Sequence, residues 1–223
     1  YDWGVERFLS GVTHSGELEN IDNPRWWQQE KEQTIRLQQA VSRKSNRRSN
    51  RRKKAVRRLG AARAKVARKR LDWAHQQTAL LASRYALVAT EELTLKNMTR
   101  SAVGTVEEPG KQVAQKAGLN REILDTAPGL FTSLFRYKVL ETGGEWVDAP
   151  TRKLKPSQRC PQCWHVAKKQ LSQRMHCCEQ CGHEENRDTA SARVVLRWAL
   201  ESISGQELAE TGGHSPRETP SFA

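Results

Sequence analysis

The sequence predicts a mixed α/β fold that carries a small metal-held module. Short apolar runs open the chain at 5–12, good helix formers fill 24–85, and two Cys-x-x-Cys pairs occur at 160–163 and 178–181. Apolar runs bounded by glycine are typical of strands, and paired cysteines at this spacing are typical of metal knuckles. Because 223 residues can bury one sizeable core and a small satellite, we expect one main domain and one insert.

The N-terminal third is expected to hold a hairpin and two helices. Glycines break the opening apolar runs, which predicts a β-hairpin over 5–12 and a third strand near 18–21. A segment rich in Ser and Asn at 42–50 interrupts the helix-forming stretch and separates two helices.

The second of these helices is expected to be amphipathic and to lie against a sheet. Its apolar side chains recur at three-, four- and seven-residue spacing, while Arg and Lys cover the opposite face. The predicted apolar face consists of Val56, Leu59, Val66, Leu71, Ala74, Thr78, Leu81 and Tyr85.

Local signals predict the remaining elements. A short apolar run at 86–90 indicates a buried strand, and the residues from 101 to 129 favour a polar loop with a short helix near 120–125. Beyond it we expect, in order, a helix at 130–140, a strand at 145–148, a helix at 189–202 and a disordered tail at 205–223.

Positive charge is concentrated in one segment. The net charge is +13, yet the 28 residues from Arg43 to Arg70 contain 15 basic and no acidic side chains. A basic helical face neutralises phosphates, so it favours a nucleic-acid partner over a solvated surface helix or an acidic lipid surface. The residues expected to contact nucleic acid are Arg43, Lys44, Arg47, Arg48, Arg51, Arg52, Lys53, Lys54, Arg57 and Arg58.

Four cysteines predict a zinc site. Cys160, Cys163, Cys178 and Cys181 form two Cys-x-x-Cys pairs separated by 14 residues, a spacing that presents four thiolates to Zn²⁺. Soft thiolates favour zinc, and four protein ligands leave no open position, which indicates a structural metal. Disulfides are a minor alternative, because an odd number of cysteines in an apparently cytosolic chain favours metal.

Other residues near the cysteines are expected to be bystanders. Cys177 would break the two-residue spacing, so we interpret it as a partly buried small apolar side chain. His165, His176 and His183 could replace a cysteine as ligands, but each is expected to be a surface histidine.

Three carboxylates are candidates for a second metal site. Asp2 opens the hairpin, Glu91 follows the apolar run at 86–90, and Asp188 precedes the closing helix. Any single acid is most often a surface charge, but three that converge could hold two Mg²⁺ ions, since Mg²⁺ prefers hard carboxylate oxygens. Two such ions are what phosphodiester hydrolysis needs.

The order of these motifs resembles the TnpB family of transposon-encoded proteins, relatives of the type V CRISPR effector nucleases. The resemblance covers roughly residues 1–200. It is carried by Tyr1-Asp-Trp-Gly-Val-Glu-Arg-Phe, Val88-Ala-Thr-Glu-Glu-Leu, the two cysteine pairs and Asn186-Arg-Asp-Thr-Ala-Ser-Ala, and by Ser42-Arg-Lys-Ser, Gln115-Lys-Ala-Gly-Leu-Asn-Arg and Leu134-Phe-Arg-Tyr-Lys.

The resemblance implies an RNase H-like (RuvC) mixed sheet with flanking helices and an inserted zinc ribbon. The implied division is a RuvC-like core at 1–157 that includes the basic helical segment 25–85, a zinc ribbon at 158–184 and a closing segment at 185–204. Asp2, Glu91 and Asp188 occupy the family's metal-binding positions, with Glu91 preferred to Glu92 because it is the first acid after the strand.

The implied activity is that of an RNA-guided DNA endonuclease that uses two Mg²⁺ ions. DNA is the expected partner, with a guide RNA for the full-length parent. A zinc-containing nucleic-acid-binding module without cleavage is the alternative. The closing helix departs from the family's usual run at Thr189-Ala-Ser-Ala192, which we expect to weaken activity modestly. No stretch approaches the roughly 18 apolar residues of a membrane span, which favours a cytoplasmic, nucleoid-associated protein without a membrane partner.

Overall fold

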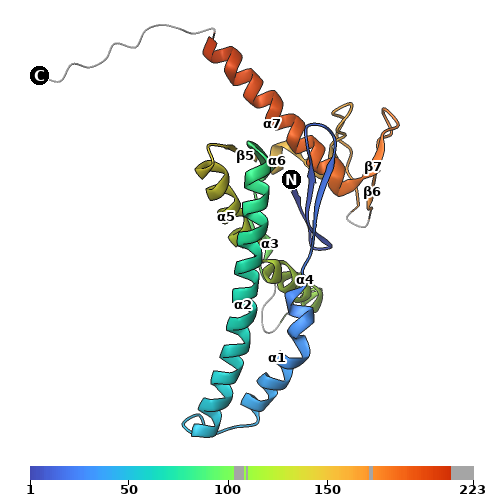
Figure 1. The fold of residues 1–223 in the computed structure, drawn as a ribbon. Helices are drawn as coiled ribbons and strands as arrows, with labels where there is room; N and C mark the ends of the chain where they lie inside the picture. The colour runs from blue at the N-terminus through green and yellow to red at the C-terminus, as the bar shows by residue number, and fades with distance from the viewer. Residues whose placement is uncertain (103–107, 109, 171–172, 212–223) are drawn as a thin grey trace, which may run out of the picture.

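The computed structural model of the chain describes residues 1–102, 108, 110–170 and 173–211. Its mixed α/β class confirms the broad prediction: helices surround small sheets, and one long helical hairpin extends away from them (Figure 1). The first sheet is antiparallel and contains β1 (Asp2–Trp3), β2 (Arg7–Val12) and β3 (Leu18–Asp22). The predicted hairpin and third strand are therefore confirmed.

The second sheet lies beside the first. It pairs β4 (Leu87–Glu91) in parallel with β5 (Glu145–Ala149). The backbone nitrogen of Tyr1 donates to the Ala89 carbonyl at 2.7 Å, and Trp3 Nε1 donates to Thr90 Oγ1 at 2.7 Å. These bonds place β1 beside the C-terminal end of β4.

Helices connect the two parallel strands. The crossover contains α3 (Leu95–Met98), α4 (Val113–Thr126) and α5 (Pro128–Glu141). A connection of this length is what a parallel pair requires, because its strands cannot be joined by a tight turn. The predicted strands at 86–90 and 145–148 and the predicted helix at 130–140 are confirmed.

The long hairpin consists of α1 (Trp26–Ser42) and α2 (Asn50–Arg84). Ser49 caps α2, because its Oγ accepts the backbone N–H of Arg52 at 3.2 Å. The Arg52 guanidinium donates to the carbonyls of Val41 and Lys44, at 3.0 and 2.9 Å, and so binds the end of α1. The predicted break between two helices is therefore a capped turn.

Only three of the eight residues of the predicted apolar face of α2 are fully buried. Ala74, Thr78 and Leu81 are 2%, 0% and 1% exposed, whereas Val56 and Leu71 are 47% and 40% exposed. The C-terminal half of α2 packs on α5 and the sheets, but the N-terminal half extends beyond them alongside α1 (Figure 1). Periodicity predicted the helix, but it did not reveal where the core ends.

Aromatic rings fill the main core between the first sheet, β4, α2 and α5. Phe8 packs edge-to-face on Phe131 and Trp73, with ring centroids 4.8 and 5.1 Å apart. The buried members of this cluster are Phe8, Leu9, Ala74, Leu81, Ala82, Val88, Phe131, Phe135 and Val139. The core therefore lies under the strands that carry Asp2 and Glu91.

Two predicted boundaries are wrong. The helix expected at 120–125 begins at Val113, because most of the residues at 113–119 are good helix formers. The closing helix, α7 (Arg187–Thr211), continues through 205–211, which the sequence analysis assigned to a disordered tail. The Gln-Glu-Leu-Ala-Glu run at 206–210 favours helix strongly enough to explain the extension. The rest of that predicted tail lies outside the described residues.

The segment that contains the cysteines is short of regular structure. It begins with α6 (Thr151–Leu154) and a 3₁₀ turn, η1 (Pro156–Gln158), and contains the antiparallel pair β6 (Met175–Cys177) and β7 (Glu184–Asn186). A second core packs α7 on β4 and β5 through Ala89, Ala149, Leu154, Val194, Val195 and Ala199. In the described part of the chain, no helix combines the length and apolar character that a membrane span requires.

Candidate functional site

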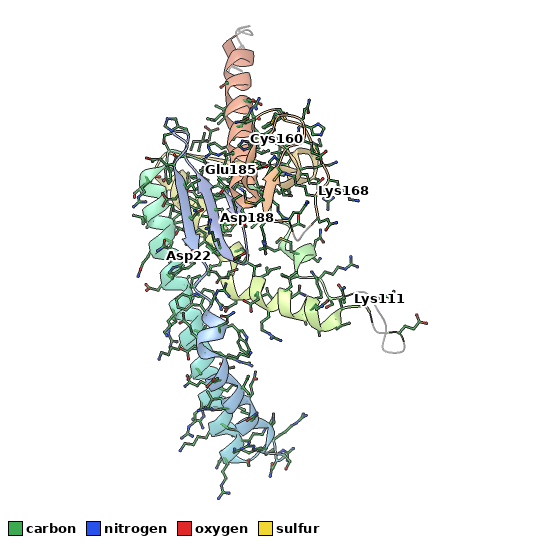
Figure 2. The ribbon with its side chains drawn as sticks, turned by 90° about the vertical axis from the view of Figure 1, so that its right-hand side faces the viewer. Asp22, Lys111, Cys160, Lys168, Glu185 and Asp188 are labelled. Atoms are coloured by element: carbon green, nitrogen blue, oxygen red, sulfur yellow. The ribbon has the colours of Figure 1, made fainter. Side chains whose placement is uncertain are left out.

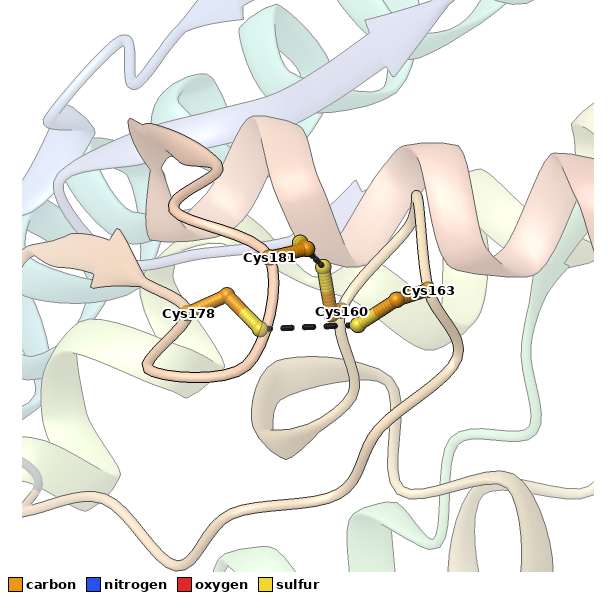
Figure 3. Close-up of side chains that lie close together, drawn as sticks. All are labelled: Cys160, Cys163, Cys178 and Cys181. Atoms are coloured by element: carbon orange, nitrogen blue, oxygen red, sulfur yellow. Dashed lines mark hydrogen bonds between the residues drawn. The ribbon is translucent and has the colours of Figure 1, made fainter.

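The four predicted zinc ligands meet in one cluster. Their sulfur atoms all lie within 4.8 Å of one another (Figure 3). The Sγ atoms of Cys160 and Cys181 are 3.6 Å apart, and those of Cys163 and Cys178 are 3.5 Å apart. A disulfide would be about 2.05 Å long, whereas the edge of a tetrahedral Zn–thiolate site is roughly 3.8 Å. The cluster is therefore suited to hold a metal ion such as zinc.

Two similar backbone turns present these sulfurs. The N–H of Cys160 donates to the His165 carbonyl at 2.8 Å, and that of Cys178 donates to the His183 carbonyl at 2.9 Å. Hydrogen bonds from backbone N–H groups, foremost that of Cys181, lower the pKa of the Cys178 thiol to about 6. This favours the thiolate, which is the form that binds metal.

A tryptophan ties the first turn to α7. Trp164 has a φ of 65°, at the position where the second turn has Gly182 with a φ of 72°. A bulky residue is strained there, yet the Trp164 ring lies under the guanidinium groups of Arg159 and Arg197, at 5.2 and 4.4 Å. Arg197, on α7, also donates to the Pro161 carbonyl at 3.0 Å. These contacts fix the first cysteine pair against the closing helix.

Two expectations for the neighbouring residues are wrong. His176 is 2% exposed and packs beside His183, with ring centroids 5.9 Å apart, so it is not a surface histidine. Burial and the contacting Lys169 ammonium lower its pKa. Cys177 is exposed, because alternate side chains of β6 point to opposite faces and His176 takes the inner one. His165 is exposed, as expected, whereas His183 is only half-buried and so is not a fully exposed surface histidine either.

The three predicted acids come together from distant parts of the chain. Asp2 lies on β1, Glu91 ends β4, and Asp188 is in the first turn of α7, which packs against the first sheet (Figure 2). Burial and the nearby charges of Glu91 and Asp188 raise the pKa of Asp2 well above its ordinary value.

The acids form a looser group than the cysteines. Among the described residues, the four cysteines alone are compact enough to form a ready metal cage. The acids are near enough to repel one another, but their oxygens are more widely spread. Glu92, the neighbour of Glu91, is exposed.

Two polar residues that the sequence analysis missed support the acids. Ser191 Oγ donates to Glu91 Oε1 at 3.1 Å. Asn186 Oδ1 accepts the N–H groups of Asp188 and Thr189, at 3.0 and 3.4 Å, and so caps α7. Ser191 lies three residues after Asp188, so both side chains are on one face of the helix. That spacing was the signal in the sequence that could have indicated a supporting role for Ser191.

The predicted nucleic-acid contacts lie around the tip of the α1–α2 hairpin. Eight of the ten are exposed, whereas Lys44 and Arg52 are half-buried. Lys44 Nζ donates to the Ala40 carbonyl at 2.6 Å, and Arg52 closes the turn between the helices. These two residues therefore stabilise the hairpin itself, and the other eight form the free basic surface: Arg43, Arg47, Arg48, Arg51, Lys53, Lys54, Arg57 and Arg58.

Comparison with known proteins finds two family models that match different segments of the chain, and two curated relatives. Residues 1–102 match the OrfB_IS605 family model, described as "Probable transposase", and residues 129–195 match the "Cas12f1-like, TNB domain" model. The chain is 34% identical over 189 residues to the "Putative RNA-guided DNA endonuclease InsQ" of Escherichia coli (strain K12), covering 83% of this chain and 46% of the relative.

A second relative and a solved structure extend the comparison. The chain is 27% identical over 228 residues to the "Putative RNA-guided DNA endonuclease" of Streptomyces pristinaespiralis, covering 99% of this chain and 52% of that protein. The chain therefore spans about half the length of the curated relatives it matches.

Its fold is similar to a chain in the "Cryo-EM structure of CRISPR-Cas12f Ternary Complex", with a TM-score of 0.58 at 15% identity, over 87% of this chain and 37% of that one. The two family models together match most of the chain, in the order in which the sequence motifs occur. The chain belongs to the TnpB family of transposon-encoded proteins.

Proposed function

We propose that this chain is the catalytic part of a transposon-associated RNA-guided DNA endonuclease that hydrolyses phosphodiester bonds with bound metal ions. One observation carries the proposal: Asp2, Glu91 and Asp188 come from three separate elements and interact at one place. The names of both curated relatives support the same activity. Because the chain spans about half of each relative, the activity of a whole protein is part of the proposal.

The proposed fold of the catalytic part is RNase H-like. The bonds from Tyr1 and Trp3 to β4 join the two sheets edge to edge, in the order β3-β2-β1-β4-β5. This order puts β1 and β4 side by side, so that Asp2 and Glu91 can face one site. The match to the Cas12f complex supports this arrangement of the backbone.

Zn²⁺ is the proposed occupant of the cysteine cluster, which then forms a zinc ribbon with β6 and β7. The sulfur separations of 3.5 and 3.6 Å suit tetrahedral thiolate coordination, and four thiolates suit a soft metal. Because four protein ligands leave no position for water, the proposed role is structural.

Mg²⁺ is the proposed occupant of the acid site. Gathering Glu91 and Asp188 beside the half-buried Asp2 is unfavourable without a cation, as the raised pKa of Asp2 indicates. Carboxylate oxygens are the donors that Mg²⁺ prefers. Two such ions, when bound, activate a water for in-line attack and stabilise the leaving oxygen. The chain's own contribution is to hold Asp2 and Glu91 on strand ends and Asp188 on a capped helix.

DNA and a guide RNA are the proposed partners. Eight exposed Arg and Lys side chains at the hairpin tip can contact phosphates, and the described residues between Arg43 and Arg70 include no acid to oppose them. The hairpin extends away from the acid site, so it can grip a duplex whose other end reaches the acids (Figure 1).

Cleavage is tested with labelled single-stranded DNA and the zinc-loaded chain. Shortened products are expected with Mg²⁺ and not with EDTA, and Asp2→Ala should abolish them, because it removes an oxygen donor from the centre of the acid site. Asp22→Ala is the matched control, since Asp22 is an exposed acid at the far end of β3. DNA that stays intact with Mg²⁺, both for the chain and for a full-length parent, would refute the nuclease.

A second candidate function is nucleic-acid binding without cleavage, favoured by the separation of the basic tip from the acids. Binding should weaken steeply with salt, and Arg51→Ala should reduce the slope of log affinity against log salt by about 1 if Arg51 contacts one phosphate. Arg136→Ala is the control, because Arg136 is an exposed arginine on α5 that pairs with Asp148. If Arg51→Ala and Arg136→Ala give equal slopes of log affinity against log salt, the hairpin is not part of the nucleic-acid interface.

A further inference from the structure

Among the described side chains of α7, Ser191 is a buried residue that hydrogen-bonds to the acid site without being an acid itself. It is 1% exposed, and its Oγ donates to Glu91 Oε1 at 3.1 Å, across 100 residues of sequence. Such a long-range contact from a buried serine is not explained by the local geometry of the helix.

The direction of the Ser191 hydroxyl differs from that of other serines in the same helix. Ser202 Oγ donates to the Trp198 carbonyl at 2.8 Å, and Ser204 Oγ donates to the Leu200 carbonyl at 2.9 Å. Bonding to the carbonyl four residues earlier is the usual local solution for a helical serine. Ser191 instead donates to a carboxylate on another element. The bond therefore orients Glu91 as well as satisfying Ser191.

The position of Glu91 makes this bond consequential. Glu91 ends β4 and lies near Asp2, whose pKa its charge helps to raise. A glutamate has three side-chain torsions, so a hydroxyl donor on one oxygen removes much of its freedom to turn away. Asp188 is one turn before Ser191 on the same helix face. Thus α7 supplies one acid directly and orients a second through Ser191.

We propose that Ser191 is a positioning residue that holds the Glu91 carboxylate ready to bind a divalent cation. The inference rests on the proposed metal site at Asp2, Glu91 and Asp188. Residues that hydrogen-bond metal ligands fix the orientation of those ligands and so raise metal affinity. Without the hydroxyl, Glu91 would have to be ordered at the moment of metal binding.

Metal affinity is the direct test. Mn²⁺ binding to the zinc-loaded chain, without nucleic acid, is measured by calorimetry, since Mn²⁺ takes the same oxygen donors as Mg²⁺. Ser191→Ala should weaken binding roughly tenfold. Ser202→Ala is the matched control and should leave binding unchanged, because it removes a hydroxyl that bonds only within α7.

A second comparison separates positioning from a structural role. In a Glu91→Gln background, Ser191→Ala should cause no further loss of Mn²⁺ affinity, because the carboxylate that Ser191 orients has gone. A merely structural serine would change the melting temperature and leave the affinity unchanged. Alanine is a good helix former, so the variant is expected to fold.

The outcomes distinguish the inference from the proposed function. If Asp2→Ala loses Mn²⁺ binding but Ser191→Ala binds as tightly as the parent chain, the metal site stands and the role of Ser191 is refuted. If the parent chain binds Mn²⁺ no better than Asp2→Ala, the metal site is refuted and the inference falls with it.

Discussion

The cysteine cluster and the acid cluster are built in opposite ways. The cysteines lie within residues 160–181 and are brought together by two short backbone turns, with sulfurs within 4.8 Å of one another. The acids lie at positions 2, 91 and 188 and meet only when two strands and a helix have packed. The cysteine site is therefore a local structure, whereas the acid site is a product of the whole fold.

The two clusters also differ in what they contribute to stability. Thiolates around a metal stabilise the folded chain, because the ligands cannot meet in the unfolded state. Converging carboxylates oppose folding until a cation joins them, since the half-buried Asp2 resists ionisation beside two other acids. The two clusters therefore have opposite effects on the stability of the metal-free chain and of the metal-bound chain.

A short chain segment connects the cysteine cluster to the acid cluster. Only six residues separate Cys181 from Asp188, and β7 lies among them. The capping residue Asn186 ends β7 and accepts the Asp188 N–H. Asn186 thus links the end of the cysteine segment to the start of α7, where Asp188 lies.

Zinc removal is expected to produce the largest effect. Chelation, or Cys178→Ser, should expose the backbone amides of 158–170, 173–186 and the first turn of α7 to rapid hydrogen exchange. Structural zinc supplies on the order of 10 kcal/mol of folding free energy to small zinc domains. Exchange measured by mass spectrometry should show this loss, with much smaller changes in α2 and α5, whose core is separate.

The matched variant for this prediction is Asp2→Asn, which alters the acid cluster and leaves every cysteine in place. Its exchange in the cysteine segment should equal that of the parent chain. Unchanged protection in a chain whose zinc has been shown by elemental analysis to be gone would mean that the cysteine segment folds without metal. That result would remove the distinction between the clusters.

The pH dependence of stability is expected to be a smaller effect, and it tests the acid cluster. A carboxyl whose pKa is raised in the folded state binds its proton more tightly there than in the unfolded chain. The free energy of unfolding should therefore fall as the pH rises from the unfolded pKa of about 3.9 through the raised folded pKa of Asp2. Above that range, Asp2→Asn should be more stable than the parent by on the order of 1 kcal/mol.

Urea denaturation at several pH values, without Mg²⁺ and with zinc bound, measures this difference. Subtracting the Asp2→Asn curve from that of the parent cancels the titration of the cysteines and histidines that both chains share. Adding Mg²⁺ should reverse the order, because the cation binds the parent more tightly than the variant. A variant that is less stable than the parent at every pH would contradict the repulsion that we assign to the acids.

The sequence predicted most elements because their signals are local. Strands at 7–12, 18–22 and 87–91 and the break before Asn50 all follow from residue type and spacing. The cysteine cluster followed equally well, since two Cys-x-x-Cys pairs define it without tertiary information. Local signals could not predict how far along α2 the core extends. Val56 and Leu71 belong to the predicted apolar face, yet both are exposed.

The acid site was predicted by resemblance, because no spacing rule links positions so far apart. The contact of Ser191 was missed for the same reason, because Ser191 meets Glu91 across 100 residues. The error at His176 is similar. A histidine in a three-residue strand carries no local signal of burial, yet the fold turns its ring inward and leaves the adjacent Cys177 exposed. Burial of this kind depends on which face of a short strand the rest of the chain covers.

The smallest expected effect concerns Cys177, the cysteine outside the cluster. Cys177→Ser should retain the full zinc content and change the free energy of unfolding by less than about 0.5 kcal/mol, as expected for an exposed side chain. Cys178→Ser, one residue away, should lose zinc. Because the two variants make the same chemical change at adjacent positions, their difference depends only on which sulfur faces the cluster.

Zinc loss in Cys177→Ser, or zinc retention in Cys178→Ser, would mean that β6 pairs with β7 one residue out of the register in which Cys177 faces Glu184. Such a shift would also move Asn186 and the start of α7, so this pair of variants tests the placement of Asp188 as well.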